Sequence, residues 1–235
     1  MGTSKGYIAP TRPEWSNAKR AVSTFLKNGD SESCANAVAK YAEAMHSGNT
    51  GNGGSTSFGS SFSSAAGNVL SFARGVSVNG LDDTLVQFGR SDLIGKPADT
   101  IIHELLDQFT NHNSTIEDAL ASEALSTAFD VLEIESPEDM ARINLDVFLM
   151  ELIIAFVNNN FDFRFYEKVS RGRTPEDTRS ILQDVHDYID GTLRSNLSTA
   201  QINKIDLSQM SANTIISTTL DDAFSTCMTF YGVET

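Results

Sequence analysis

The sequence contains few cysteines and no thiol-pairing motif. Its two cysteines, Cys34 and Cys227, lie far apart and have no CxxC or CxxxH companion. A disulfide framework needs more thiols, and a structural zinc site needs thiols or imidazoles at close spacing, so neither is expected. Reduced thiols in a cytoplasmic protein are the expectation that follows.

A long apolar run is also missing. The most apolar stretch, residues 143–157, is interrupted by Asn144, Asp146 and Glu151. That pattern favours a buried helix over a membrane span. The first apolar segment is too short and lacks the charged lead-in of a secretory signal. We therefore expect a cytoplasmic protein that does not act at a membrane.

Basic residues are scarce and acidic residues are unevenly placed. The chain has 17 Lys and Arg against 31 Asp and Glu, a formal net charge of −14. Residues 1–76 carry 7 basic and 4 acidic side chains, residues 77–157 carry 3 and 16, and residues 158–235 carry 7 and 11. This balance argues against direct nucleic-acid binding. The acidic middle third is either a solvated helical surface or a docking face for a basic partner.

The apolar spacing is helical and no stretch alternates like a strand. We predict an all-α fold, an irregular multi-helix bundle. Its predicted parts are an extended N-terminal tail (1–13), a helical pair (14–46), a Gly/Ser-rich loop or linker (47–57) and a main helical body (58–235). Predicted helices span about 16–27, 31–46, 58–76, 81–88, 97–110, 114–133, 136–157, 174–194 and 212–230, with another starting near 198.

Several helix starts carry capping signals, in which a Ser or Thr hydroxyl is followed three residues later by an acidic or amide side chain. The predicted starts are Ser16, Ser114 with Glu117, Ser136 with Asp139, Thr174 with Asp177, and Ser198 with Gln201. The glycines of the third helix predict close approach of a neighbouring element rather than a functional site.

Motifs for catalysis or metal binding are incomplete. Residues 89–97, GRSDLIGKP, have five residues between the glycines and Pro97 where a phosphate loop needs Ser or Thr. His103 and Glu104 lack the second histidine of HExxH. The remaining candidates are His186 with Asp190 as a metal pair, and Asp146 or Glu151 as buried acids of an unrecognised hydrolase. We predict no catalytic residue, no cofactor and no metal.

The segment FDFRFYEKVSRGR, residues 161–173, interleaves aromatic and basic side chains. Either its phenylalanines belong to the core and its cations are solvated, or the segment is an interface, because protein interfaces are enriched in aromatics and arginine. In the second case Arg164, Arg171 and Arg173 are candidate docking residues for a protein partner.

The amino terminus offers a nucleophile. Removal of Met1 would leave Gly2 as the terminal residue, and about a tenth of its amine would be unprotonated at pH 7. Gly2 has no Cβ, and Thr3, Ser4 and Gly6 keep this tail slim. Position 6 is Gly, so the myristoylation pattern is not met.

The opening MGTSKGY, with Pro10, Pro13 and Trp15, resembles the start of the B component of the Qat anti-phage defence system, the QatB family. The resemblance covers about 15 residues. It implies a helical, non-enzymatic protein encoded beside a P-loop ATPase, a homologue of the 7-cyano-7-deazaguanine synthase (QueC-like) and a TatD-like nuclease.

The resemblance further implies that the synthase-like enzyme attaches a 7-deazaguanine base to Gly2. Residues Gly2, Thr3, Ser4, Lys5 and Gly6 would then lie in the cleft of that enzyme. The alternative is a structural or regulatory adaptor that docks the P-loop ATPase without being modified.

Overall fold

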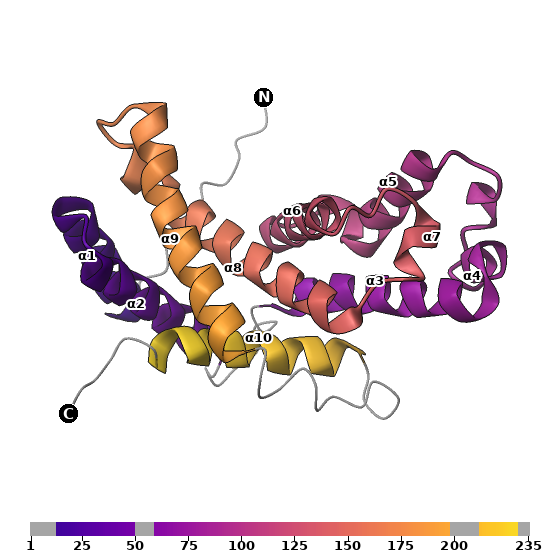
Figure 1. The fold of residues 1–235 in the computed structure, drawn as a ribbon, viewed down its shortest axis with the longest axis horizontal. Coiled ribbons are helices and arrows are strands. Elements are labelled where there is room, and N and C mark those ends of the chain that lie inside the picture. The colour runs from indigo at the N-terminus through magenta and orange to yellow at the C-terminus, as the bar shows by residue number, and fades with distance from the viewer. Residues whose placement is uncertain (1–12, 50–58, 198–211, 230–235) are drawn as a thin grey trace.

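The computed structural model describes residues 13–49, 59–197 and 212–229, which form ten α-helices and two short 3-10 helices without a strand (Figure 1). The predicted all-α class is confirmed. The helices are α1 Pro13–Asn28, α2 Ser31–Asn49, α3 Ser60–Asn79, α4 Leu81–Gln87, α5 Ala98–Phe109, α6 Ile116–Val131, α7 Pro137–Met140, α8 Leu145–Ser170, α9 Pro175–Asn196 and α10 Ala212–Thr229. None of them is long and apolar enough to cross a membrane.

Helix α8 runs through the middle of the molecule (Figure 1). It contacts α6, α9, α1 and α10, while α10 packs on α2, α3 and α9. Helices α1, α2 and α9 lie at one end, and α3 leads to α4 at the other. The buried apolar side chains of α1 to α10 belong to one continuous cluster, so these elements share a core.

Aromatic side chains join α2, α3 and α8 in that core. The fully buried Tyr41 meets Phe161 edge to face with ring centroids 5.3 Å apart, and its hydroxyl donates to the Val157 carbonyl at 3.1 Å. Phe62 stacks on Phe156 with centroids 3.9 Å apart. Burying each ring contributes about 1.5–3 kcal/mol, so these contacts are a major source of the stability of this region.

The predicted apolar helix over 136–157 starts at the predicted cap, but it is interrupted after Met140 and its predicted end is wrong. A short α7 stops at Met140, and α8 starts afresh because the Asn144 side chain accepts hydrogen bonds from the Asp146 and Val147 amides at 3.0 and 3.3 Å. Helix α8 then continues past Val157 to Ser170. It therefore contains most of the aromatic and basic segment 161–173.

The capping predictions are partly right. Ser136 with Asp139 and Thr174 with Asp177 cap as predicted. For α6 the capping pair is Thr115 with Asp118, one residue later than predicted. Helix α1 starts at Pro13 rather than Ser16. Helix α2 extends to Asn49, into the predicted loop 47–57. Residues 50–57 and the start predicted at Ser198 and Gln201 lie outside the described residues.

Glu117 caps a different helix from the one predicted. Its carboxylate accepts from the Ser61 amide at 3.0 Å, in the first turn of α3. The N-cap residue there is Gly59, which has no side chain to do this. Burial raises the pKa of Glu117, and the backbone amides of Ser61 and Phe62 oppose that shift. A carboxylate from α6 thus fixes where α3 begins.

Glycines in α3 allow close approach, as predicted. A Cβ on Gly75 would lie 2.7 Å from Cγ2 and 3.0 Å from Oγ1 of Thr84 in α4. Thr84 is fully buried, and its hydroxyl donates to the Gly80 carbonyl at 2.7 Å, so its side chain cannot move aside without losing that bond. The packing of α4 on α3 therefore depends on Gly75.

We expect Gly75→Ala to lower the free energy of unfolding by about 1–3 kcal/mol, because the added methyl overpacks the α3–α4 contact. The matched control is Gly191→Ala in α9, where a Cβ would meet nothing within 4 Å. Alanine there should be neutral or stabilise by up to about 1 kcal/mol. Denaturant unfolding of both variants tests this, and equal stability of the two would contradict it.

Candidate functional site

The residues predicted to enter a partner's cleft lie outside the described part of the chain. They are Gly2, Thr3, Ser4, Lys5 and Gly6, and the description begins at Pro13, the first residue of α1. The acceptor role of Gly2 therefore stays a prediction. The structure does define the place from which the N-terminal residues depart, which is the start of α1.

The start of α1 is held against α8 by Trp15. Its side chain is 6% exposed, and its ring centroid lies 6.5 Å from that of Phe165. The guanidinium carbon of Arg164 lies 5.0 Å from the Trp15 centroid and 5.6 Å from the Phe163 centroid. Burial lowers the pKa of Arg164 to about 10, which leaves the group charged at neutral pH. The resulting cation–π contacts contribute about 0.5–2 kcal/mol each.

The end of α1 is held by Arg173. This side chain donates to the Val169 carbonyl of α8 at 2.8 Å and to the Leu26 carbonyl of α1 at 3.4 Å. Carbonyls in the last turn of a helix lack intrahelical donors and favour a cation. Because Trp15 meets residues 164–165 and Leu26 meets Arg173, α1 runs in the same direction as the second half of α8.

The three candidate docking arginines therefore have different environments. Arg164 packs between aromatic rings, and Arg173 binds backbone carbonyls. Arg171 lies on the surface with 78% of its side chain exposed, 3.1 Å from the Glu167 carboxylate. A docking role for any of them stays a prediction, but only Arg171 presents most of its side chain to solvent.

The aromatic residues of the segment divide into two pairs. Phe161 and Phe165 are in the core, with 0% and 1% exposure. Phe163 and Tyr166 are 39% and 56% exposed on neighbouring turns of α8. The other large hydrophobic residues exposed in the described part of the chain are aliphatic and lie between Val78 and Val147. The core interpretation is thus right for Phe161 and Phe165, and an interface role for Phe163 and Tyr166 stays a prediction.

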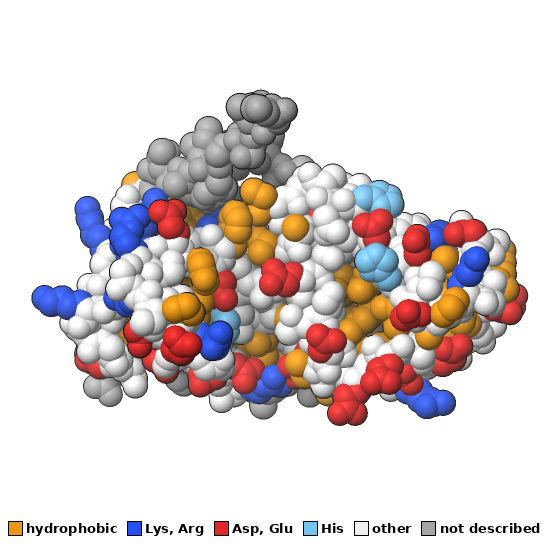
Figure 2. Space-filling view, turned by 90° about the horizontal axis from the view of Figure 1, so that it is seen from above, with side chains coloured by type: hydrophobic (Ala, Val, Ile, Leu, Met, Phe, Trp, Pro, Cys, Tyr) orange, Lys and Arg blue, Asp and Glu red, His pale blue; other side chains and the backbone are white. Residues whose placement is uncertain are grey.

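Charge is distributed differently at the two ends of the molecule. Figure 2 shows several Lys and Arg side chains projecting from the end that carries α1 in Figure 1, while Asp and Glu side chains are spread over the whole of the face shown, this end included. The acidic middle third of the sequence, residues 77–157, contributes α4 to α7 and the first half of α8.

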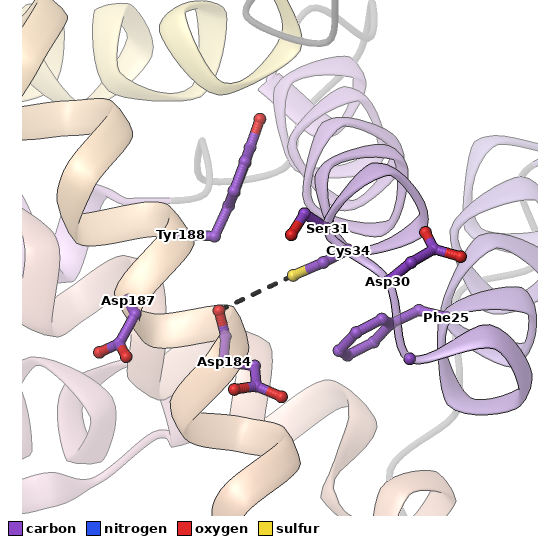
Figure 3. A pocket seen from close by; sticks show the side chains of 8 residues that line it. Phe25, Asp30, Ser31, Cys34, Asp184, Asp187 and Tyr188 are labelled. Carbon is purple, nitrogen blue, oxygen red and sulfur yellow. Dashed lines mark hydrogen bonds between the residues drawn. The ribbon is translucent and has the colours of Figure 1, made fainter.

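A pocket of about 370 Å³ lies where the turn between α1 and α2 meets α9 (Figure 3). Figure 3 shows Cys34 pointing toward the Asp184 carbonyl, 3.8 Å away. Burial raises the pKa of this thiol to about 12, so it stays protonated at neutral pH. Two of the carboxylates that line the pocket have local partners: Asp30 accepts from the Ser33 amide at 2.7 Å and Asp187 from Gln183 at 2.7 Å.

The two candidate acids, Glu151 and Asp146, have different chemical environments. Glu151 is 8% exposed, and its two oxygens accept from the Arg194 guanidinium at 2.6 and 2.7 Å. Such a bidentate pair fixes the carboxylate as an acceptor. Asp146 is exposed in the first turn of α8. The environment of Glu151 is that of a structural ion pair between α8 and α9.

The two residues of the candidate metal pair, His186 and Asp190, each contact a different side chain. His186 Nε2 lies 2.9 Å from an Asp162 oxygen, whereas Asp190 accepts from Arg194 at 2.7 Å. Within residues 13–49, 59–197 and 212–229, no group of three or more His, Cys, Asp and Glu side chains is placed to hold a metal ion. The i, i+4 spacing of His186 and Asp190 thus reflects two independent pairs.

Comparison with known proteins gives a family match. The family model described as Qat anti-phage system associated protein QatB matches residues 51–227. No match is found among curated proteins or among solved structures.

Arg171 and Arg173 give a testable contrast. We expect Arg173→Ala to lower the free energy of unfolding by about 1–3 kcal/mol, because carbonyls of α1 and α8 lose a charged donor. Arg171→Ala, two residues away, removes only an exposed ion pair and should change stability by less than about 1 kcal/mol. Thermal melts of the two variants measure this, and an Arg171 effect as large as that of Arg173 would refute the assignment.

Proposed function

This chain is a member of the QatB family of the Qat anti-phage system, and we propose that it serves the system as an acceptor rather than as an enzyme. The acceptor group is the amine of Gly2 after removal of Met1. The modifying enzyme is the 7-cyano-7-deazaguanine-synthase-like partner, and the group transferred is a 7-deazaguanine. Family membership together with the glycine at position 2 carries the proposal.

The chemistry requires ATP and a carboxylate on the deazaguanine. The carboxylate attacks the α-phosphorus of ATP and releases pyrophosphate, which leaves an acyl-adenylate in the partner's cleft. The neutral Gly2 amine then attacks the acyl carbon, AMP leaves, and the nitrogen loses a proton to form an amide. An α-amine with a pKa near 8 suits this step at neutral pH, whereas a lysine amine is almost fully protonated.

The folded body supplies the attachment point of the acceptor rather than the catalytic groups. Trp15, Arg164 and Phe165 hold the start of α1 on α8, so the N-terminal residues leave from a fixed position. The buried acid Glu151 is committed to Arg194. These contacts support an acceptor more than a hydrolase that works through Glu151.

An adaptor that docks the P-loop ATPase without modification is the second candidate. The exposed side chains of Tyr166 and Arg171 favour it, because aromatic and arginine residues are enriched at the centres of protein interfaces. This candidate predicts that deletion of residues 2–8 leaves phage protection intact in a plaque assay.

The acceptor proposal is tested by mass spectrometry after co-expression with the partner proteins. The N-terminal peptide of the unaltered chain and of Thr11→Ala, which lies outside residues 2–6, should carry a deazaguanine acyl group on the Gly2 nitrogen. Gly2→Pro, which leaves only a hindered secondary amine, should carry at least tenfold less. An unmodified Gly2 beside an active synthase-like enzyme would refute the proposal and leave the adaptor.

A further inference from the structure

The proposed function limits where the modifying enzyme can dock. An extended chain spans at most about 3.3–3.6 Å per residue. If residues 2–6 occupy the enzyme's cleft, the seven Cα–Cα steps from Gly6 to Pro13 span at most about 25 Å. The mouth of the cleft must therefore lie within that distance of the start of α1.

The far end of α3 and helix α4 lie at the opposite end of the molecule from α1 (Figure 1). Helix α3 has 20 residues and is about 30 Å long. It leads away from the end that carries α1, and α4 follows at its far end (Figure 1). The exposed aliphatic residues Val78 and Val86 are at that far end of α3 and on α4. An enzyme that docked only there would need a cleft that extends back to within about 25 Å of the start of α1 to receive Gly2.

The surface next to the start of α1 has a different character. Arg164 lies between the ring of Trp15, in the first turn of α1, and the ring of Phe163. Phe163 is thus an exposed aromatic residue beside the start of α1, and Tyr166 is exposed on the next turn of α8. Arg171 lies beyond them on the surface at the end of α8.

We infer that Phe163, Tyr166 and Arg171 form the docking surface for the enzyme that modifies Gly2. This inference rests on the proposed function. The partner face that fits it has an apolar pocket for an aromatic ring with a carboxylate at its edge. Interface energy concentrates in aromatic residues and arginine, which are the residue types of this surface.

The test compares two substitutions at equal exposure. Tyr166 and Val131 are each 56% exposed, and Val131 lies on α6, in the acidic middle third of the sequence. We expect Tyr166→Asp to raise the Kd of the purified full-length chain for the synthase-like enzyme at least tenfold, and Val131→Asp to change it less than twofold. Melting temperatures of both variants report folding, and Tyr166→Ser replaces Tyr166→Asp if the charge prevents folding.

A second readout separates the docking surface from the acceptor function. With ATP and the deazaguanine carboxylate, Tyr166→Asp should lower kcat/KM for Gly2 modification through KM, while a free peptide of residues 2–12 should react at that same low level. If Gly2 is never modified but Kd still rises only for Tyr166→Asp, the acceptor function fails and the surface stands. If folded Tyr166→Asp has an unchanged Kd for the synthase-like enzyme, the docking surface is overturned. The same conclusion holds if the substitution changes only the self-association of this chain.

Discussion

The buried aromatic side chains of α8 determine where α1, α2 and α3 lie. Tyr41 of α2 packs on Phe161, Phe62 of α3 stacks on Phe156, and Trp15 of α1 packs on Phe165. These contacts follow one another along the same helix, so a single continuous α8 sets the positions of α1, α2 and α3. Buried aromatic contacts of this kind resist small shifts because protein interiors are close-packed.

The position of α1 on α8 would matter for the proposed acceptor function. Trp15 fixes the beginning of α1 and Arg173 fixes its end, so the residues before Pro13 are attached to a rigid platform. A short connection to a rigid platform raises the effective concentration of the Gly2 amine near any enzyme docked beside it. Binding and acceptor functions would then belong to neighbouring parts of one surface, in keeping with a chain of the QatB family.

Local signals were the part of the fold that could be predicted. Helical periodicity and the caps at Ser136 and Thr174 are properties of a few adjacent residues. The prediction failed where a distant residue decides the outcome: Glu117 caps α3 rather than its own helix. In the candidate site, the pattern of residues 161–173 predicted core phenylalanines, and Phe161 and Phe165 are buried. It could not separate Arg171 from Arg173, because the Leu26 carbonyl that binds Arg173 comes from another helix.

The central claim is that the modifying enzyme meets the body of this protein at α8, beside the start of α1. Incorporation of a photoreactive phenylalanine analogue tests it directly in the assembled complex. The analogue at position 166 should cross-link to the synthase-like enzyme, and the same analogue at position 86 on α4 should not. Cross-linking from position 86 with none from position 166 would contradict the claim.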